Sequence, residues 1–245
     1  MDAVRALIAL VVLVLLVRAA RMAWRHRQVS LRVWRAVRPR HVVGSVGLLA
    51  VVLSTLLVLL TVVPGAWIGL GSLVGLTGNA VFAPLEGVAL RADGSGAAVA
   101  APSPWVVAGV LAFLALLLAL LPWLAFVEER VFREGLETAT LTGEVTSALR
   151  FGLLHLVMLI PIGAALAIAV AGFAYGRLYR RAYARSRARV TWQRPSVAGA
   201  LPTWTRPSPQ QARAEAVLAT TVWHATFNSL VVLLVGAGLL VGWLG

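Results

Sequence analysis

Three groups of polar side chains stand at helical spacing in an otherwise apolar sequence. The first group, Glu128-Glu129 with Arg133, comes directly after LAFLALLLALLPWLAFV, a stretch without any charge. Glu129 and Arg133 are four residues apart, the spacing of an ion pair within a helix. A charge near the centre of a bilayer costs about 2.5–3.5 kcal/mol. These charges therefore need either partners that offset this cost or a chemical task.

The other two groups repeat the i,i+4 spacing. Phe151 and His155 share a face in FGLLH, and His224 and Asn228 share a face in HATFN. We expect all three groups to face the interior of a helix bundle, because the alternative is lipid. Hydrolysis of a peptide needs a base that activates water and donors aimed at the developing oxyanion. Glutamate, histidine and asparagine can fill these roles.

Each group also has a simpler structural interpretation. The adjacent glutamates could be an interfacial charge pair that balances nearby arginines. His155 could be a core histidine bonded to a backbone carbonyl, and Phe151 is more typical of packing than of chemistry. His224 and Asn228 could join helices through polar contacts, which are worth about 0.6 kcal/mol each.

Together, the patterns EExxxR, FxxxH and HxxxN resemble the CPBP family, which includes type II CAAX prenyl endopeptidases and bacterial Abi proteins. The segment GFAYGRLYRR (172–181) is similar to the glycine-rich helix that follows the second motif in that family. The resemblance covers residues 105–235. It implies intramembrane endoproteolysis of a membrane-tethered or lipidated peptide, or of a C-terminal sorting helix.

The resemblance also implies roles for the motif residues. Glu128 would be the general base, and His155 would help to hold or polarise the attacking water. His224 and Asn228 would stabilise the oxyanion.

The remaining motif residues, Glu129, Arg133 and Phe151, would organise the site. The expected mechanism uses no cofactor. A zinc site of Glu128, His155 and His224 is the alternative, since two histidines and one carboxylate suit zinc. Other open alternatives are a catalytically idle immunity or scaffold protein and a small transporter, although the internal repeats typical of transporters are not evident.

Composition and charge indicate a membrane protein. Of the 245 residues, 60% are hydrophobic and 13% are charged, against about 25% charged in soluble domains. The net charge is +13, which in a soluble protein would suggest a nucleic-acid partner. Here the arginines cluster in 18–40 and 177–194, beside apolar stretches. This pattern predicts cytoplasmic loops that face anionic headgroups, and no nucleic-acid partner. The absence of cysteine excludes disulfides and thiol ligands.

Hydropathy predicts an all-α, polytopic helix bundle of about six spans in the inner (cytoplasmic) membrane, with the active site between the helices that carry the three motifs. We expect one membrane domain over 1–245, with N-terminal spans and an outer loop in 1–104 and the catalytic core in 105–235. Both termini are expected outside, and Pro161 should break a helix. The expected spans are 3–24, 42–63, 105–127, 144–160, 163–180 and 214–245. The expected connections are a surface helix within 21–41, an outer loop over 64–104 and an irregular inner loop over 184–211.

Overall fold

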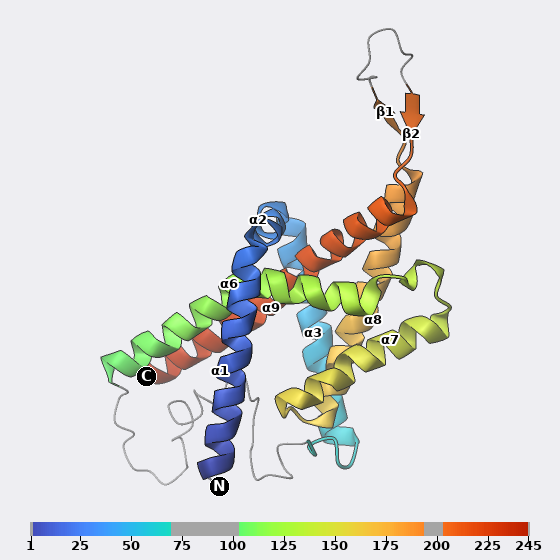
Figure 1. Ribbon diagram of the computed structural model, residues 1–245. Coiled ribbons are helices and arrows are strands. Elements are labelled where there is room, and N and C mark those ends of the chain that lie inside the picture. Colours follow the sequence, from blue (N-terminus) through green and yellow to red (C-terminus); the bar gives the residue numbers. More distant parts are fainter. Residues whose placement is uncertain (1, 70–102, 194–202, 245) are drawn as a thin grey trace.

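The described part of the chain is almost entirely helical. The computed structural model describes residues 2–69, 103–193 and 203–244, and Figure 1 shows long helices that cross one another, with one small hairpin projecting from the bundle. The elements are α1 (Asp2–Arg25), α2 (Arg27–Ala36), α3 (Pro39–Val62), α6 (Pro104–Arg133), η1 (Leu136–Thr138), α7 (Leu141–Leu154), η2 (His155–Met158), α8 (Ile162–Ala188), β1 (Thr191–Gln193), β2 (Thr203–Thr205) and α9 (Pro209–Leu244). This architecture confirms the predicted helical bundle.

Four of the described helices, α3, α6, α8 and α9, are long and apolar enough to cross a membrane. The predicted span 144–160 forms a helix of only 14 residues, α7, followed by a single 3₁₀ turn. At 1.5 Å per residue, α7 is about 21 Å long, shorter than a bilayer core of about 30 Å. These four apolar helices indicate a membrane protein, and the count of six spans stays a prediction.

The predicted break at Pro161 coincides with the turn between α7 and α8. Leu159 has a positive φ of 66°, and Pro161 caps the start of α8 in an extended conformation. The backbone N–H of Ile162 donates to the Ile68 carbonyl, and that of Gly163 donates to the Ala66 carbonyl, both at 2.9 Å. The turn therefore rests against the segment that follows α3.

Small residues let α8 occupy the centre of the bundle, where it packs against α3, α7 and α9. Gly152 of α7 lies so close to α8 that a Cβ built there would be 2.3 Å from the Ala165 carbonyl oxygen. Ala165, Ala167 and Ala169 of α8 are buried, and α6 packs alongside α9. This close approach of backbones carries α7, and with it the second motif, next to the motif helices α6 and α9.

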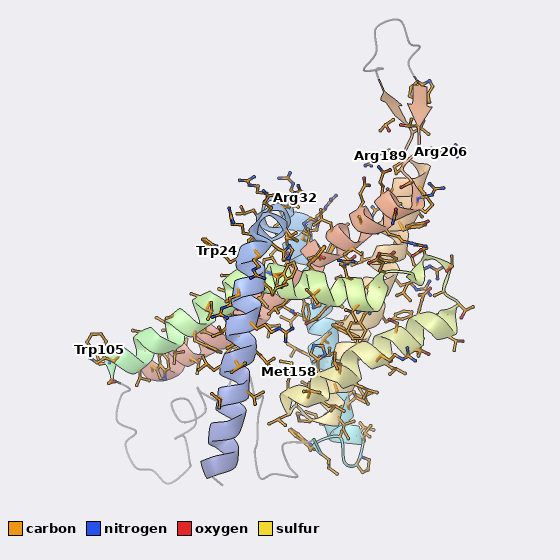
Figure 2. All side chains as sticks on the ribbon, viewed as in Figure 1. Trp24, Arg32, Trp105, Met158, Arg189 and Arg206 are labelled. Atoms are coloured by element: carbon orange, nitrogen blue, oxygen red, sulfur yellow. The ribbon has the colours of Figure 1, made fainter. Side chains whose placement is uncertain are left out.

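The predicted surface helix within 21–41 is α2. Its Val33 is fully buried against α6 and α9, whereas its arginines are exposed. Figure 2 shows Arg32 pointing away from the bundle. The basic side chains therefore lie on the outer face of this helix, as amphipathic patterning requires.

Two predicted connections differ from the structure or fall outside it. The predicted irregular loop 184–211 is wrong in part, because α8 continues to Ala188, β1 and β2 form an antiparallel hairpin, and α9 begins at Pro209. The predicted last span, 214–245, is a single helix that begins earlier than expected. Most of the predicted outer loop 64–104 lies outside the described residues.

Candidate active site

Side chains from four helices meet in the interior of the bundle. Glu129 and Arg133 come from the last turns of α6, Phe151 from the end of α7, Tyr175 from the middle of α8 and His224 from the middle of α9. Each of these five side chains is at most 2% exposed. Helices α6 and α9 supply the ionisable groups, while α7 and α8 supply the aromatic walls.

A buried ion pair lies at one end of this cluster. Arg133 Nε is 3.8 Å from Glu129 Oε2, and both side chains are 0% exposed. Arg133 also donates from Nη1 to the Phe132 carbonyl (3.4 Å) and to Ser147 Oγ (3.5 Å), and its guanidinium lies 4.6 Å from the centre of the Phe151 ring. Because the partners of Arg133 come from α6 and α7, this residue ties the first motif to the second.

The imidazole of His224 lies between the two adjacent glutamates. Its Nδ1 is 2.9 Å from Glu129 Oε1, and its Nε2 is 3.5 Å from Glu128 Oε2. An ionised carboxylate only accepts hydrogen bonds, so Nδ1 must carry a proton toward Glu129. At 3.5 Å, Nε2 faces Glu128 Oε2 without a hydrogen bond, so this nitrogen is not committed to a partner as Nδ1 is. The arrangement can thus hold or move a proton at Nε2.

Aromatic rings fix the plane of His224. The Tyr175 ring stacks on it, with centroids 4.7 Å apart and an interplanar angle of 23°. Phe151 meets it edge to face at 5.6 Å and meets His155 in the same manner at 4.9 Å. With carboxylates at both nitrogens and rings against its faces, His224 is held in one orientation.

Glu128 differs from Glu129 in its access to solvent. The Glu128 side chain is 32% exposed, and that of Glu129 is 0% exposed. Glu129 is committed to Arg133 and His224, whereas Glu128 contacts His224 alone among the ion pairs of the described residues. Glu128 is therefore the carboxylate that a water or a substrate could reach.

Two residues predicted for the site lie at its margin. His155 is half-buried in η2, and its Nδ1 is 2.8 Å from the Phe151 carbonyl oxygen, with no ion pair to either glutamate. Asn228 is half-buried one turn after His224, and its side chain has no hydrogen bond to the described part of the chain. The structure brings Glu128, Glu129, Arg133, Phe151 and His224 together, and His155 contacts this group through the Phe151 ring.

The zinc alternative does not fit this arrangement. Among residues 2–69, 103–193 and 203–244, no group of three or more histidine, cysteine, aspartate or glutamate side chains is placed to hold a metal ion. The proposed donors Glu128 and His224 are close, but His155 does not join them in such a group. We derive no catalytic step through a metal.

Sequence reasoning missed Tyr175 and Ser147. Tyr175 lies within GFAYGRLYRR, and it contacts His224 through its ring. Ser147 donates to the Phe132 carbonyl at 2.6 Å and accepts from Arg133. Ser147 and Phe151 are four residues apart on α7, so the helical spacing of the second motif could have indicated Ser147 one turn before it.

The comparisons with known proteins identify no relative. No protein-family model matches the chain, and no curated protein and no solved structure is significantly similar to it. Membership of the CPBP family therefore stays a prediction that depends on the three motifs.

Proposed function

We propose that this protein is an intramembrane endopeptidase of the CPBP type that hydrolyses a peptide bond with a glutamate-activated water. The observation that supports the proposal most is the position of His224 between Glu128 and Glu129. The buried ion pair of Glu129 and Arg133, taken alone, would indicate a structural role and no chemistry. A buried imidazole that contacts a second, partly exposed carboxylate is typical of proton transfer.

In the proposed mechanism, Glu128 removes a proton from water, and the hydroxide attacks the carbonyl carbon of the scissile bond. The proton passes to the leaving amine nitrogen as the carbon–nitrogen bond breaks, with His224 Nε2 beside its path. Glu129 and Arg133 hold the imidazole in place through Nδ1, 2.9 Å from the Glu129 carboxylate. Positioned acid–base groups of this kind contribute about 10²–10⁴-fold to a rate.

The two marginal residues take supporting roles in this proposal. His155 borders the site across the Phe151 ring and helps to orient the water or the substrate. The Asn228 amide, one turn after His224, has donors for the developing oxyanion. Both roles come from the family resemblance.

The proposed substrate is a membrane-anchored or lipidated peptide. Four apolar helices surround the site or pack against it, so a peptide that reaches Glu128 is expected to approach from the bilayer or its surface. The exposed arginines of α2 suit anionic headgroups of a cytoplasmic membrane. Both the substrate class and the multi-pass location in that membrane are part of the proposal.

The experiment is a comparison of the membrane proteome in cells that produce the wild-type chain, Glu128→Gln or His224→Ala. We expect the same uncut precursors to accumulate with both variants. Glu134→Gln is the control, because Glu134 is an exposed glutamate paired only with Arg130 on the surface of α6. Normal processing with both site variants would leave an idle scaffold or immunity protein as the better explanation. Activity of the purified protein with and without a chelator tests the metal-free mechanism.

A further inference from the structure

Helix α8 carries two buried tyrosines, four residues apart, whose hydroxyl groups have different surroundings. Tyr179 is fully buried, and its Oη donates to Glu137 Oε2 at 2.9 Å. Tyr175 is 1% exposed, and its Oη is buried without any hydrogen-bond partner in the described part of the chain. A buried hydroxyl without an acceptor is unfavourable, and such groups often mark a functional site.

The position of Tyr175 connects its hydroxyl to the candidate site. The ring stacks on His224 at 4.7 Å and meets Phe227 edge to face. The His224 ring on which it stacks is itself in contact with both Glu129 and Glu128. The Tyr175 ring is therefore fixed by packing against the histidine at the centre of the site, while its hydroxyl group has no hydrogen-bond partner among the described residues.

The arrangement of His224 shows why the site needs another donor. Both ring nitrogens of His224 are turned toward carboxylates, Nδ1 toward Glu129 and Nε2 toward Glu128. A neutral imidazole has a single N–H, and when Nδ1 donates it to Glu129, Nε2 has no proton to donate to a substrate carbonyl oxygen. Asn228 alone would then have to stabilise the charge that develops on that oxygen, a task usually shared by two donors.

We propose that Tyr175 is a catalytic residue whose hydroxyl group donates a hydrogen bond to the carbonyl oxygen of the scissile peptide bond as that oxygen becomes an oxyanion. The inference rests on the proposed endopeptidase function and replaces His224 by Tyr175 as a partner of Asn228. The phenol keeps its proton throughout, so the reaction steps are otherwise unchanged. The stacked ring holds the donor in place before the substrate binds.

The test compares Tyr175→Phe with Tyr179→Phe, since each variant removes one hydroxyl group and keeps the ring. Processing rates are measured by pulse-chase in cells, on precursors that accumulate with Glu128→Gln, and are normalised to the amount of each variant. Thermal unfolding of the purified variants is measured in detergent. For Tyr175→Phe we expect processing to slow about a hundredfold, with an unfolding temperature equal to or above that of the wild type. For Tyr179→Phe we expect near wild-type processing and a lower unfolding temperature.

Two results would overturn the role of Tyr175 while the endopeptidase function stands. One is a wild-type processing rate with Tyr175→Phe. The other is a drop in unfolding temperature as large as that of Tyr179→Phe, which would show that the Tyr175 hydroxyl has a structural partner. If no precursor depends on Glu128, the endopeptidase function and the role of Tyr175 are both overturned.

Discussion

The candidate site can be compared with a second polar cluster, the clasp formed by Glu137, Tyr179 and Arg213. Each contains a buried tyrosine of α8, but the two regions differ in how many of their buried polar atoms have hydrogen bonds. In the clasp, Glu137 Oε1 accepts from Arg213 Nε, and Glu137 Oε2 accepts from Tyr179 Oη at 2.9 Å. The backbone N–H of Gly135 also donates to Tyr179 Oη at 3.4 Å. The clasp joins η1, α8 and α9, and none of its side-chain polar atoms is buried without a hydrogen-bond partner.

The candidate site leaves several buried polar atoms without hydrogen bonds. They are Glu128 Oε2, Glu129 Oε2, Arg133 Nε, Arg133 Nη2 and Tyr175 Oη. Buried polar atoms without hydrogen bonds lower the stability of the folded protein. Several of them in one place are typical of a functional site, where activity requires an arrangement that is not the most stable one. We therefore expect substitutions in the clasp to affect stability alone and substitutions in the site to affect activity as well.

The largest effect on stability should come from Glu129→Gln. This change leaves the charge of Arg133 buried without a counter-ion, and removal of one partner of a buried pair costs about 3–5 kcal/mol. Processing should be lost as well, because His224 loses its carboxylate at Nδ1. Glu134→Gln is the matched control, since its pair with Arg130 is 61% and 41% exposed. Unfolding of both variants in detergent checks this expectation. Equal stabilities of Glu129→Gln and Glu134→Gln would show that the buried ion pair does not stabilise the fold.

An intermediate effect is expected from Gly152→Ala. The added Cβ would lie 2.3 Å from the Ala165 carbonyl oxygen and 2.8 Å from the Ala169 nitrogen, both backbone atoms of α8. Overpacking of this kind costs about 1–3 kcal/mol, and α7 must shift away from α8 together with Phe151. Gly109→Ala is the control, because nothing lies within 4 Å of a Cβ at that helical position. The unfolding temperature should fall for Gly152→Ala only. A fall for both variants would mean that the cause is not the contact with α8, because Gly109→Ala makes no such contact.

The smallest effect is the pH dependence of the clasp. Burial raises the pKa of Glu137, but hydrogen bonds from its own backbone, Arg213 and Tyr179 outweigh burial and lower the pKa below the ordinary value of 4.5. A carboxyl group with a lowered pKa in the folded state stabilises the fold above its ordinary pKa, and this contribution is lost as the pH falls through the folded-state pKa. The Arg213 side chain is 41% exposed, so water screens part of the interaction.

The measurement is the difference in unfolding temperature between the wild type and Glu137→Gln as a function of pH. The difference should be constant at neutral pH and should shrink below pH 4.5, the ordinary pKa of the group. A difference that grows on acidification would contradict the lowered pKa.

Much of the fold could be predicted because its signals are local. Long apolar stretches predicted α3, α6, α8 and α9, and Pro161 predicted the turn before α8. The segment 184–211 was misread because its prolines and arginines masked two short strand signals. TWQ and TWT pair in the register Thr191 with Thr205 and Trp192 with Trp204, and threonine and tryptophan favour strands.

The candidate site was predictable only in part. Spacing along one helix placed Glu129 and Arg133 on a common face, and the structure shows them paired. Spacing also placed Phe151 and His155 together, but it could not show that the Phe151 ring contacts both His155 and His224 while His155 forms no ion pair with either glutamate. A helical pattern describes the faces of single helices and carries no information on how far one helix slides along another.

By itself, the sequence determined that this chain is a helical membrane protein with three internal polar groups, because hydropathy and i,i+4 spacing are properties of neighbouring residues. The tertiary structure alone decided which carboxylate holds His224, which one stays accessible and which tyrosine lacks a partner. The bond between His224 and Glu129 joins residues 95 positions apart. It depends on the close packing of α6 and α9, and on the small residues that let α7 and α8 complete the walls of the site.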